Sequence, residues 1–184
     1  MTAFDDPSRR PVPGDQARVS VLVEVPPQAA FRTFHEDIDQ WWRRGRRYRM
    51  AGTRRGIIAL EPRVGGRLFE SFDTAAGTQV IETGRITAWE PPEGPGSSSA
   101  AGRMAFQWRN ANFADGESTE VEVLFEPSLS GTLVTVTHRG WSRIRPDHPA
   151  RHGLEVAPFI RMMGMWWGDL MTALREHART RKLR

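Results

Sequence analysis

The sequence has no cysteine, a single tyrosine and, among its 26 basic residues, a single lysine, Lys182. Without cysteine the chain has no disulfide bonds, thiolate nucleophile, iron–sulfur cluster or zinc site that uses Cys, and it suits a reducing compartment. A phosphate-binding loop needs a lysine that only the polar tail could supply, so nucleotide hydrolysis is not expected. The sequence also lacks a long apolar run and the apolar segment of a signal peptide. We therefore expect a soluble, cytoplasmic protein with no membrane partner.

The 184 residues are 39% hydrophobic and 26% charged, which suits one globular domain with one sizeable core. The formal net charge of +4 is too small to indicate a nucleic-acid partner. Residues 1–16 are polar and contain three prolines, so we predict a flexible leader followed by a single domain over 17–184. Residues 91–102, PPEGPGSSSAAG, predict a mobile insertion loop within that domain.

Alternating hydrophobic residues predict seven strands. The first is RVSVLVEV at 18–25, where every second residue is a valine. Pro26 and Pro27 end this strand and favour a helix start, and AAFRTFHEDIDQWW at 29–42 has roughly helical spacing, which predicts one or two short helices. Six later runs, separated by turn residues, are predicted as antiparallel strands at 56–62, 66–72, 78–90, 102–110, 118–127 and 131–141.

After His152 the hydrophobic residues follow i, i+3, i+4 spacing from Val156 to Leu174, which predicts a long amphipathic C-terminal helix. A twisted sheet with one apolar face must be covered, and this helix is the only predicted element long enough to cover it. Twist curls a sheet away from a straight helix. We therefore expect an α+β fold with a cavity between sheet and helix, a usual place for an apolar ligand.

These segments, in this order, resemble the activator of heat-shock-protein-90 ATPase homologue-like family of the SRPBCC, or START-like, helix-grip superfamily. The short helices end in the tryptophan pair of that family, EPRVGGRLFE resembles its paired-glycine hairpin, and GRITAWEPPE resembles its strand leading into proline. MAFQW, EVEVLFEP and SGTLVTVTHRGW are similar to its last strands. The resemblance implies a curved sheet of about seven strands gripping the C-terminal helix. It does not imply one reaction, since the superfamily includes lipid carriers, hormone receptors and polyketide cyclases.

No motif in the chain predicts a catalytic residue, metal ion or cofactor. His148 and His152 are four residues apart, but Pro149 interrupts a helix and no third ligand accompanies them, so a solvated loop is the favoured interpretation. Strand alternation places His138 on the face that should look into the cavity. This imidazole could orient a ligand or act as a general acid or base, whereas the favoured alternative is a hydrogen bond that satisfies nearby backbone.

Aromatic and thioether side chains are the candidate ligand contacts. Trp166 and Trp167 are adjacent on the last helix, so at most one of them can point squarely at the sheet. Of Trp41 and Trp42, we expect one in the core and one at a rim. Gly164, which lies four residues before Gly168, indicates either close helix packing or room for a ligand. The predicted ligand-binding set is Trp42, Phe72, Phe106, Trp108, Phe125, His138, Trp141, Met163, Trp166 and Trp167.

Seven arginines lie between Arg43 and Arg55, a pattern typical of a solvated loop; only Tyr48 accompanies them, and stacking on nucleic-acid bases would need more aromatic residues. We predict a protein that binds a small hydrophobic or amphipathic ligand. The alternatives are a cyclase or dehydratase that uses His138 as acid and base, and a chaperone-associated adaptor with a protein partner. The sequence leaves monomer and homodimer open.

Overall fold

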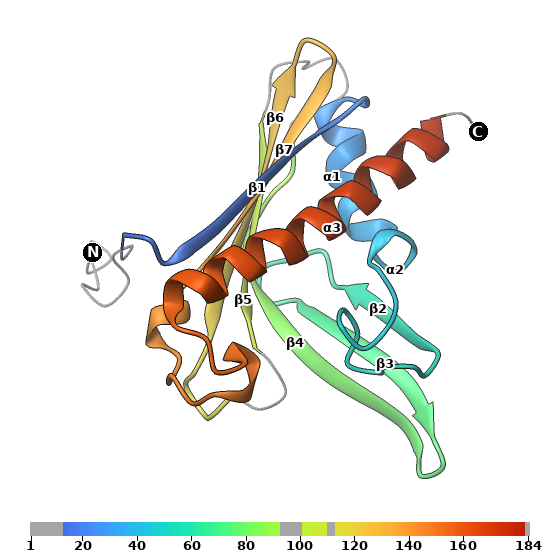
Figure 1. Cartoon of the computed structure of the whole chain (residues 1–184). Helices are drawn as coiled ribbons and strands as arrows, with labels where there is room; N and C mark the ends of the chain where they lie inside the picture. The colour runs from blue at the N-terminus through green and yellow to red at the C-terminus, as the bar shows by residue number, and fades with distance from the viewer. Residues whose placement is uncertain (1–12, 93–100, 110–112, 183–184) are drawn as a thin grey trace, which may run out of the picture.

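A computed structural model of the chain describes residues 13–92, 101–109 and 113–182. Seven strands form one antiparallel sheet in the order β1-β7-β6-β5-β4-β3-β2. The strands are β1 (Gln16–Val23), β2 (Gly56–Leu60), β3 (Arg67–Thr74), β4 (Gly77–Glu90), β5 (Gly102–Trp108), β6 (Thr119–Ser128) and β7 (Gly131–Arg139). Figure 1 shows this sheet curved around the long helix α3 (Val156–Lys182). The predicted helix-grip architecture is confirmed.

Two short helices, α1 (Pro27–Glu36) and α2 (Ile38–Trp41), connect β1 to the rest of the sheet. Proline occupies the first turn of α1, where its missing N–H costs no helical hydrogen bond and its fixed φ favours the helix. Two single-turn 3₁₀ helices, η2 (Trp141–Arg143) and η3 (Pro149–Arg151), precede α3. They form the compact lobe beside the N-terminal end of α3 in Figure 1.

The two segments predicted to be mobile fall largely outside the described residues. These are 1–12 of the leader and 93–100 of the insertion. The strands nevertheless reach into both predicted segments, since β1 begins at Gln16 and β5 begins at Gly102. The carboxylate of Asp15 accepts hydrogen bonds from the backbone N–H of Ser142, at 2.9 Å, and from its hydroxyl, at 2.6 Å. The folded domain therefore includes Asp15 and Gln16.

Irregular pairing at β4 bends the sheet. The register of β4 shifts against β3 between Leu68 and Phe69, and against β5 between Ile86 and Ala88. Such bulges increase the local twist. Between them, Gly84 lies so close to β5 that a Cβ there would be 2.8 Å from the carbonyl oxygen of Gln107. This part of the sheet turns away from the straight axis of α3.

The core lies between the concave face of the sheet and the helices. Phe34 of α1, Phe125 of β6, and Trp167 and Leu170 of α3 are each fully buried. Phe125 contacts the rings of Phe31 and Phe34 at centroid distances of 5.0 and 5.6 Å. Among the described residues, no helix is long and apolar enough to cross a membrane.

Gly164 and Gly168 on α3 are explained neither by close helix packing nor by room for a ligand. A Cβ added at Gly164 or Gly168 would have no heavy atom within 4 Å, leaving aside the backbone of the helix itself and the neighbouring residues, so no close packing requires these glycines. Neither residue lines the cavity described below.

Replacing Gly164 or Gly168 with alanine should therefore stabilise the protein. Glycine in a helix interior costs about 1 kcal/mol relative to alanine, so each change should raise the free energy of unfolding by about that amount. Urea unfolding followed by far-UV circular dichroism would measure it. A loss of stability in either variant would contradict the open surroundings of these positions.

Candidate ligand-binding cavity

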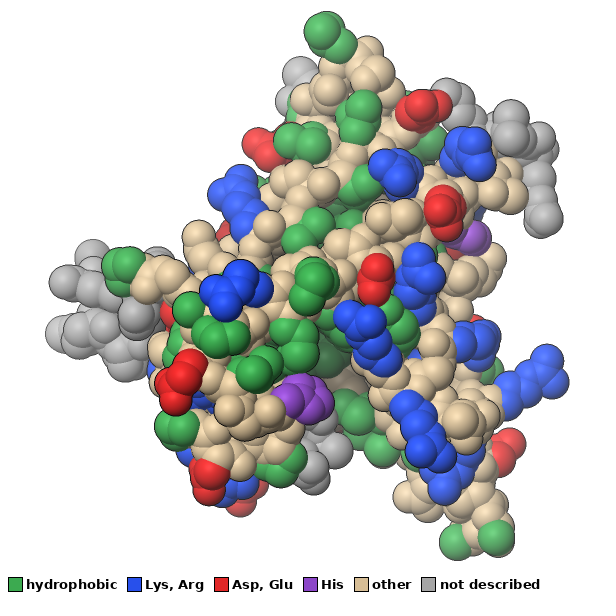
Figure 2. Space-filling view, in the orientation of Figure 1, with side chains coloured by type: hydrophobic (Ala, Val, Ile, Leu, Met, Phe, Trp, Pro, Cys, Tyr) green, Lys and Arg blue, Asp and Glu red, His purple; other side chains and the backbone are tan. Residues whose placement is uncertain are grey.

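A cavity of about 450 Å³ lies between α3, the lobe that contains η3, the loop after α2 and the inner face of β3 to β5. Figure 2 shows the corresponding hollow below the middle of α3, with hydrophobic side chains on one rim and Lys or Arg side chains on the other. The apolar part of its wall combines indole and thioether groups, from Trp42, Trp108, Trp141, Trp166, Met50, Met162 and Met163, with Ile58, Leu68 and Phe159.

Five of the ten predicted ligand-binding residues line this cavity: Trp42, Trp108, Trp141, Met163 and Trp166. The other five, Phe72, Phe106, Phe125, His138 and Trp167, are buried but do not line it. Alternation along a strand shows which side chains face inward, and it does not show where along the sheet a neighbouring element fills the space. Phe125, for example, is covered by the rings of α1.

The tryptophans of the cavity wall differ in their N–H groups: those of Trp42 and Trp166 bind the protein backbone, whereas that of Trp141 is buried with no hydrogen-bond partner among the described residues. Trp42 and Trp108 are nearly parallel, at 14° and 6.1 Å between centroids, and the Trp166 ring meets both of them edge to face. The indole N–H of Trp42 donates to the carbonyl of Tyr48, and that of Trp166 donates to the carbonyl of Arg47, both at 2.9 Å. Trp42 and Trp166 therefore offer aromatic surface and no free donor, and Trp141 keeps an unpaired N–H.

The tryptophan pairs differ in how well they were predicted. Trp167 is buried and Trp166 is partly exposed, as adjacent helical positions require. Trp41 and Trp42, in contrast, are each only 2% exposed, so neither lies at an open rim. Trp41 fills the core and donates its N–H to the carbonyl of Phe34, whereas Trp42 forms part of the cavity wall.

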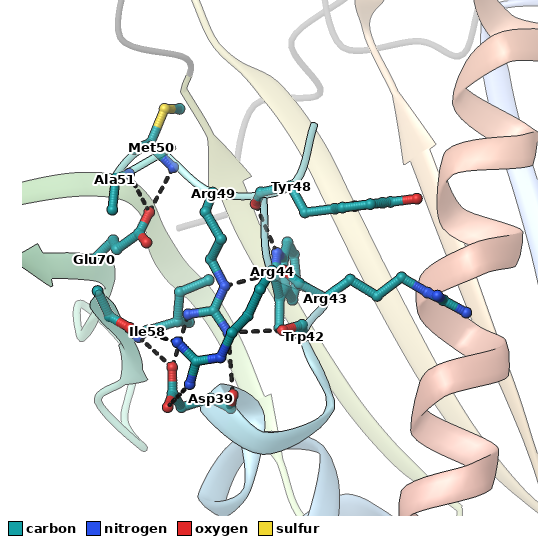
Figure 3. A network of polar contacts seen from close by, with 11 residues as sticks. Asp39, Trp42, Arg43, Arg44, Tyr48, Arg49, Met50, Ala51, Ile58 and Glu70 are labelled. Carbon is teal, nitrogen blue, oxygen red and sulfur yellow. Dashed lines mark hydrogen bonds and ion pairs between the residues drawn. The ribbon is translucent and has the colours of Figure 1, made fainter. Parts of the chain in front are cut away.

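The arginine-rich segment, residues 43–55, forms one wall of the cavity and is tied down from within. Arg49 is 6% exposed, and its guanidinium donates to Asp39 Oδ1 at 2.7 Å and to the carbonyl of Trp42 at 2.7 Å. It donates further to the carbonyls of Asp39 and Arg43. Figure 3 shows this network folding the segment back onto α2. The segment is thus not the freely solvated loop that its composition predicts.

Asp39 is the acceptor that organises this segment. Its carboxylate also accepts from Arg44 and from the backbone N–H of Ile58 at 3.0 Å. Burial disfavours the charged carboxylate, but the hydrogen bonds from Arg49 and Ile58 and the charges of Arg49 and Arg44 outweigh burial, so the pKa of Asp39 lies below its usual value. One ionised side chain therefore joins α2, the segment and β2.

Two further carboxylates attach the same segment to β3 and α3. Glu70 Oε2 accepts the backbone N–H of Met50 at 2.6 Å and that of Ala51 at 3.2 Å. The Tyr48 hydroxyl donates to Asp169 Oδ2 at 2.7 Å. In Figure 3 the side chains of Tyr48 and Arg43 both extend toward α3.

The cavity wall includes residues that sequence reasoning missed, among them Tyr48, Met50 and Glu70, and Ala150 and His152 of the lobe before α3. One signal was present. Glu70 alternates with Leu68 and Phe72 on the buried face of its strand, and a carboxylate on an apolar face needs a partner. The lobe residues carry no periodic pattern that could have placed them.

His138 lies in the core instead of the cavity wall. It is fully buried, Nδ1 is 3.2 Å from Trp167 Nε1, and Nε2 is 2.7 Å from Thr119 Oγ1. An indole N–H can only donate, so Nδ1 is the acceptor and the proton of the neutral ring is on Nε2. Nε2–H then donates to Thr119, whose hydroxyl donates to the carbonyl of Trp108. Burial lowers the pKa of His138 to about 3. The ring is a neutral structural link.

The other two candidate histidines have separate surroundings. His148 is buried, its Nδ1 accepts the backbone N–H of Ala150 at 3.0 Å, and its ring meets Phe113 edge to face. His152 is exposed on the cavity wall and has a left-handed backbone with φ 52°. Within the described ranges, no group of three or more His, Asp or Glu residues is arranged to hold a metal ion.

A curved antiparallel sheet that grips a C-terminal helix and leaves a cavity under it defines the helix-grip class of proteins. Within that class, the chain belongs to the family described as activator of Hsp90 ATPase homolog 1-like protein, whose model matches residues 24–157. No curated protein matches the chain significantly.

Solved structures support the fold. A protein of unknown function from Staphylococcus aureus is 13% identical and has a TM-score of 0.61, with 92% of this chain and 96% of that chain covered. An AHSA1-like protein from Aeromonas hydrophila is 15% identical with a TM-score of 0.54, covering 92% and 95% of the two chains. The Aha1 dimer from Colwellia psychrerythraea is also 15% identical with a TM-score of 0.54, covering 88% and 93%.

The two arginines that pair with Asp39 should differ sharply in their effect on stability. Arg49 has a side chain only 3% exposed, whereas that of Arg44 is 60% exposed. Arg49→Met should lower the free energy of unfolding by about 2–4 kcal/mol, because it leaves a partly buried carboxylate without its main partner. The matched variant Arg44→Met should cost less than about 1 kcal/mol. Urea unfolding measures both, and equal losses would contradict the role assigned to Arg49.

The neutral His138 should make stability fall as the solution is acidified. Its pKa is about 3 in the folded protein and 6.5 as a free group, so below pH 6.5 the unfolded chain binds a proton that the folded chain does not. The contribution of His138 to the free energy of unfolding is therefore full above pH 6.5. Between pH 6.5 and pH 3 it falls by about 1.4 kcal/mol for each pH unit of acidification.

His138→Gln keeps a neutral donor and acceptor but does not titrate. Between about pH 7 and pH 5, the stability advantage of the wild type over this variant should shrink by about 2 kcal/mol in urea unfolding. A nitrogen NMR signal of His138 that titrates near neutral pH would contradict the assignment.

Proposed function

We propose that the protein binds a small hydrophobic or amphipathic molecule in the cavity under α3. The observation that carries this proposal is the aromatic wall formed by Trp42, Trp108 and Trp166. Two of these indoles have their N–H groups bound to the backbone of the arginine-rich segment, so they offer a ligand ring surface and no free N–H donor. Ring faces bind apolar and unsaturated molecules with little selectivity for hydrogen bonds.

The size of the cavity supports the same proposal. Its volume of about 450 Å³ falls within the range of roughly 300–1,000 Å³ usual for small-molecule sites. Met50, Met162 and Met163 give the wall side chains that adapt to different shapes. The site therefore suits a ligand of moderate size with an apolar body.

The enzyme alternative depended on His138 as acid and base. That ring is buried between Thr119 and Trp167 and is not part of the cavity wall. A general acid or base must reach the proton that it transfers, directly or through one water, so His138 does not support this alternative. The binding proposal needs no catalytic residue and no cofactor.

If the protein were a chaperone-associated adaptor, its cavity should be too small to hold a ligand. The cavity volume of about 450 Å³ instead favours a ligand-binding protein. The family description names an Hsp90 ATPase activator, which is a property of that family's namesake. The dimer from Colwellia psychrerythraea is a precedent for self-association of this fold. For the present chain, monomer or homodimer and a cytoplasmic location both stay predictions.

The binding proposal is tested with N-phenyl-1-naphthylamine, a neutral apolar dye whose fluorescence rises in apolar sites. The wild type should bind it at micromolar concentrations. Ala150 lines the cavity, so Ala150→Phe should fill the space and weaken binding by at least about tenfold. The matched control is Ala75→Phe in the exposed β3–β4 turn, which should leave binding within about twofold.

Absence of dye binding to the folded wild type would refute the proposal, as would equal binding by the wild type and Ala150→Phe. Circular dichroism of each variant establishes that it is folded. Native mass spectrometry of freshly purified protein gives a second measurement, because a bound molecule adds its mass to the protein and Ala150→Phe should reduce that fraction.

A further inference from the structure

The cavity has one strongly charged side, formed by Arg46 and Arg47 of the arginine-rich segment. Both side chains are exposed at this side, which forms the outer wall. They differ from their neighbours in how their charges are used. Arg44 and Arg49 both pair closely with Asp39 of α2, at 3.1 Å or less, so these two guanidinium groups share a carboxylate that does not line the cavity.

Arg46 and Arg47 are less closely paired with carboxylates. Arg46 has no carboxylate within ion-pair distance among the residues that the structure describes. Arg47 lies 3.7 Å from Asp169 Oδ2, the same oxygen that accepts the Tyr48 hydroxyl at 2.7 Å. Arg43 donates to the backbone carbonyl of Asp169, so among the described residues the Asp169 carboxylate is the one acidic group that pairs with any of Arg43, Arg46 and Arg47. The outer wall therefore carries excess positive charge.

We propose that the ligand of this cavity is an amphipathic acid, with its apolar body between the tryptophans and its anionic oxygens on Arg46 and Arg47. This inference rests on the proposed function and adds the chemical class of the ligand. Guanidinium groups present parallel N–H donors that match the oxygens of a carboxylate or sulfonate. A neutral apolar ligand would leave Arg46 without a carboxylate partner and Arg47 with only its 3.7 Å pair to Asp169.

The charged groups on the inner side of the cavity, Glu70 and Arg49, determine how an acidic ligand would be oriented. Glu70 is 2% exposed and lies under the segment, where Oε2 is occupied by the N–H groups of Met50 and Ala51. A negative group placed beside Glu70 would be repelled, and Arg49 is already committed to Asp39. The acid group therefore belongs at the outer wall, with the apolar end pointing toward Trp108 and Trp141.

The same arginines could attract a nucleic-acid backbone, but the aromatic groups lie in the wrong place for that partner. Bases stack on aromatic rings exposed beside a basic surface. Here the Trp42 ring is buried, and the Tyr48 ring stacks on Trp166 at 6.0 Å, so both rings pack within the cavity wall. A small acid uses the cations and the aromatic cavity together, whereas a polymer would use the cations alone.

The test uses two dyes that share one apolar body. 1-Anilinonaphthalene-8-sulfonate is N-phenyl-1-naphthylamine with an added sulfonate. The double variant Arg46→Gln/Arg47→Gln should lower the affinity for the sulfonate dye by at least about tenfold. The affinity for the neutral dye should change by less than about twofold. Competition between the dyes establishes that both occupy the same cavity.

The matched control is Arg54→Gln/Arg55→Gln. It removes the same charge from the same segment, but both side chains line a separate open depression instead of the cavity. This control should leave the affinity for both dyes within about twofold of the wild type. Raising the salt concentration from about 50 to about 500 mM should lower the affinity of the wild type for the sulfonate dye and leave its affinity for the neutral dye unchanged.

A second pair of probes replaces the sulfonate with a carboxylate. Dodecanoate should displace the neutral dye from the wild type at a lower concentration than 1-dodecanol does, although the alcohol is the more apolar of the two. In Arg46→Gln/Arg47→Gln this preference should disappear, and in the control variant it should remain.

The outcomes separate the two proposals. If the neutral dye binds and the affinity for the sulfonate dye is the same in the wild type and Arg46→Gln/Arg47→Gln, the proposal that the ligand is an acid is wrong. The proposal that the cavity binds an apolar molecule then stands. Equal weakening of the sulfonate dye in both double variants would mean general attraction to a basic segment, and it would also overturn the ligand class. Failure of both dyes to bind the wild type would overturn the binding function and the ligand class with it.

Discussion

A straight helix laid on a curved sheet cannot contact it along its whole length, and the site depends on this misfit. On one side, α3 packs against β1, and Trp167 and Leu170 complete a dense core. On the other side, the bulged strand β4 carries the sheet away from the helix, where the cavity is lined by Leu68, Thr83 and Trp108 of β3 to β5. The curvature of the sheet against the straight helix thus produces both the dense core on one side and the cavity on the other.

The open side becomes an enclosed site only because the arginine-rich segment is held over it. The segment has little periodic structure, and polar contacts from three elements hold it: Asp39 on α2, Glu70 on β3 and Asp169 on α3. Glu70 is the buried one of these carboxylates, and the N–H groups of Met50 and Ala51 give its Oε2 the partners that a buried carboxylate needs. Of the arginines on the cavity wall, Arg49 is held by Asp39, whereas Arg46 and Arg47 are exposed and Arg47 has only a 3.7 Å pair with Asp169.

The hydrogen-bonded chain from Trp167 through His138 and Thr119 to Trp108 shows how polar groups lie in the same core without contributing chemistry. The chain satisfies the imidazole at both nitrogens and fixes its tautomer, so the ring joins β6 and β7 to α3. Because Trp108 is also part of the cavity wall, this buried link positions one of the surfaces that a ligand would meet.

Most of the fold was predictable from the sequence, because period-2 and period-3.6 patterns report directly on which residues face the core. Seven strands, one or two short helices and the long final helix follow from those patterns and from the resemblance they carry. About half of the predicted site residues lie on the cavity, among them Trp42, Trp108 and Trp166. The residues that were misplaced or missed depend on contacts between distant segments: His138 is enclosed by Trp167 and Thr119, and Arg49 is buried by Asp39. Periodicity determines which way a side chain points, and only the packing of whole elements decides whether it meets protein or open space.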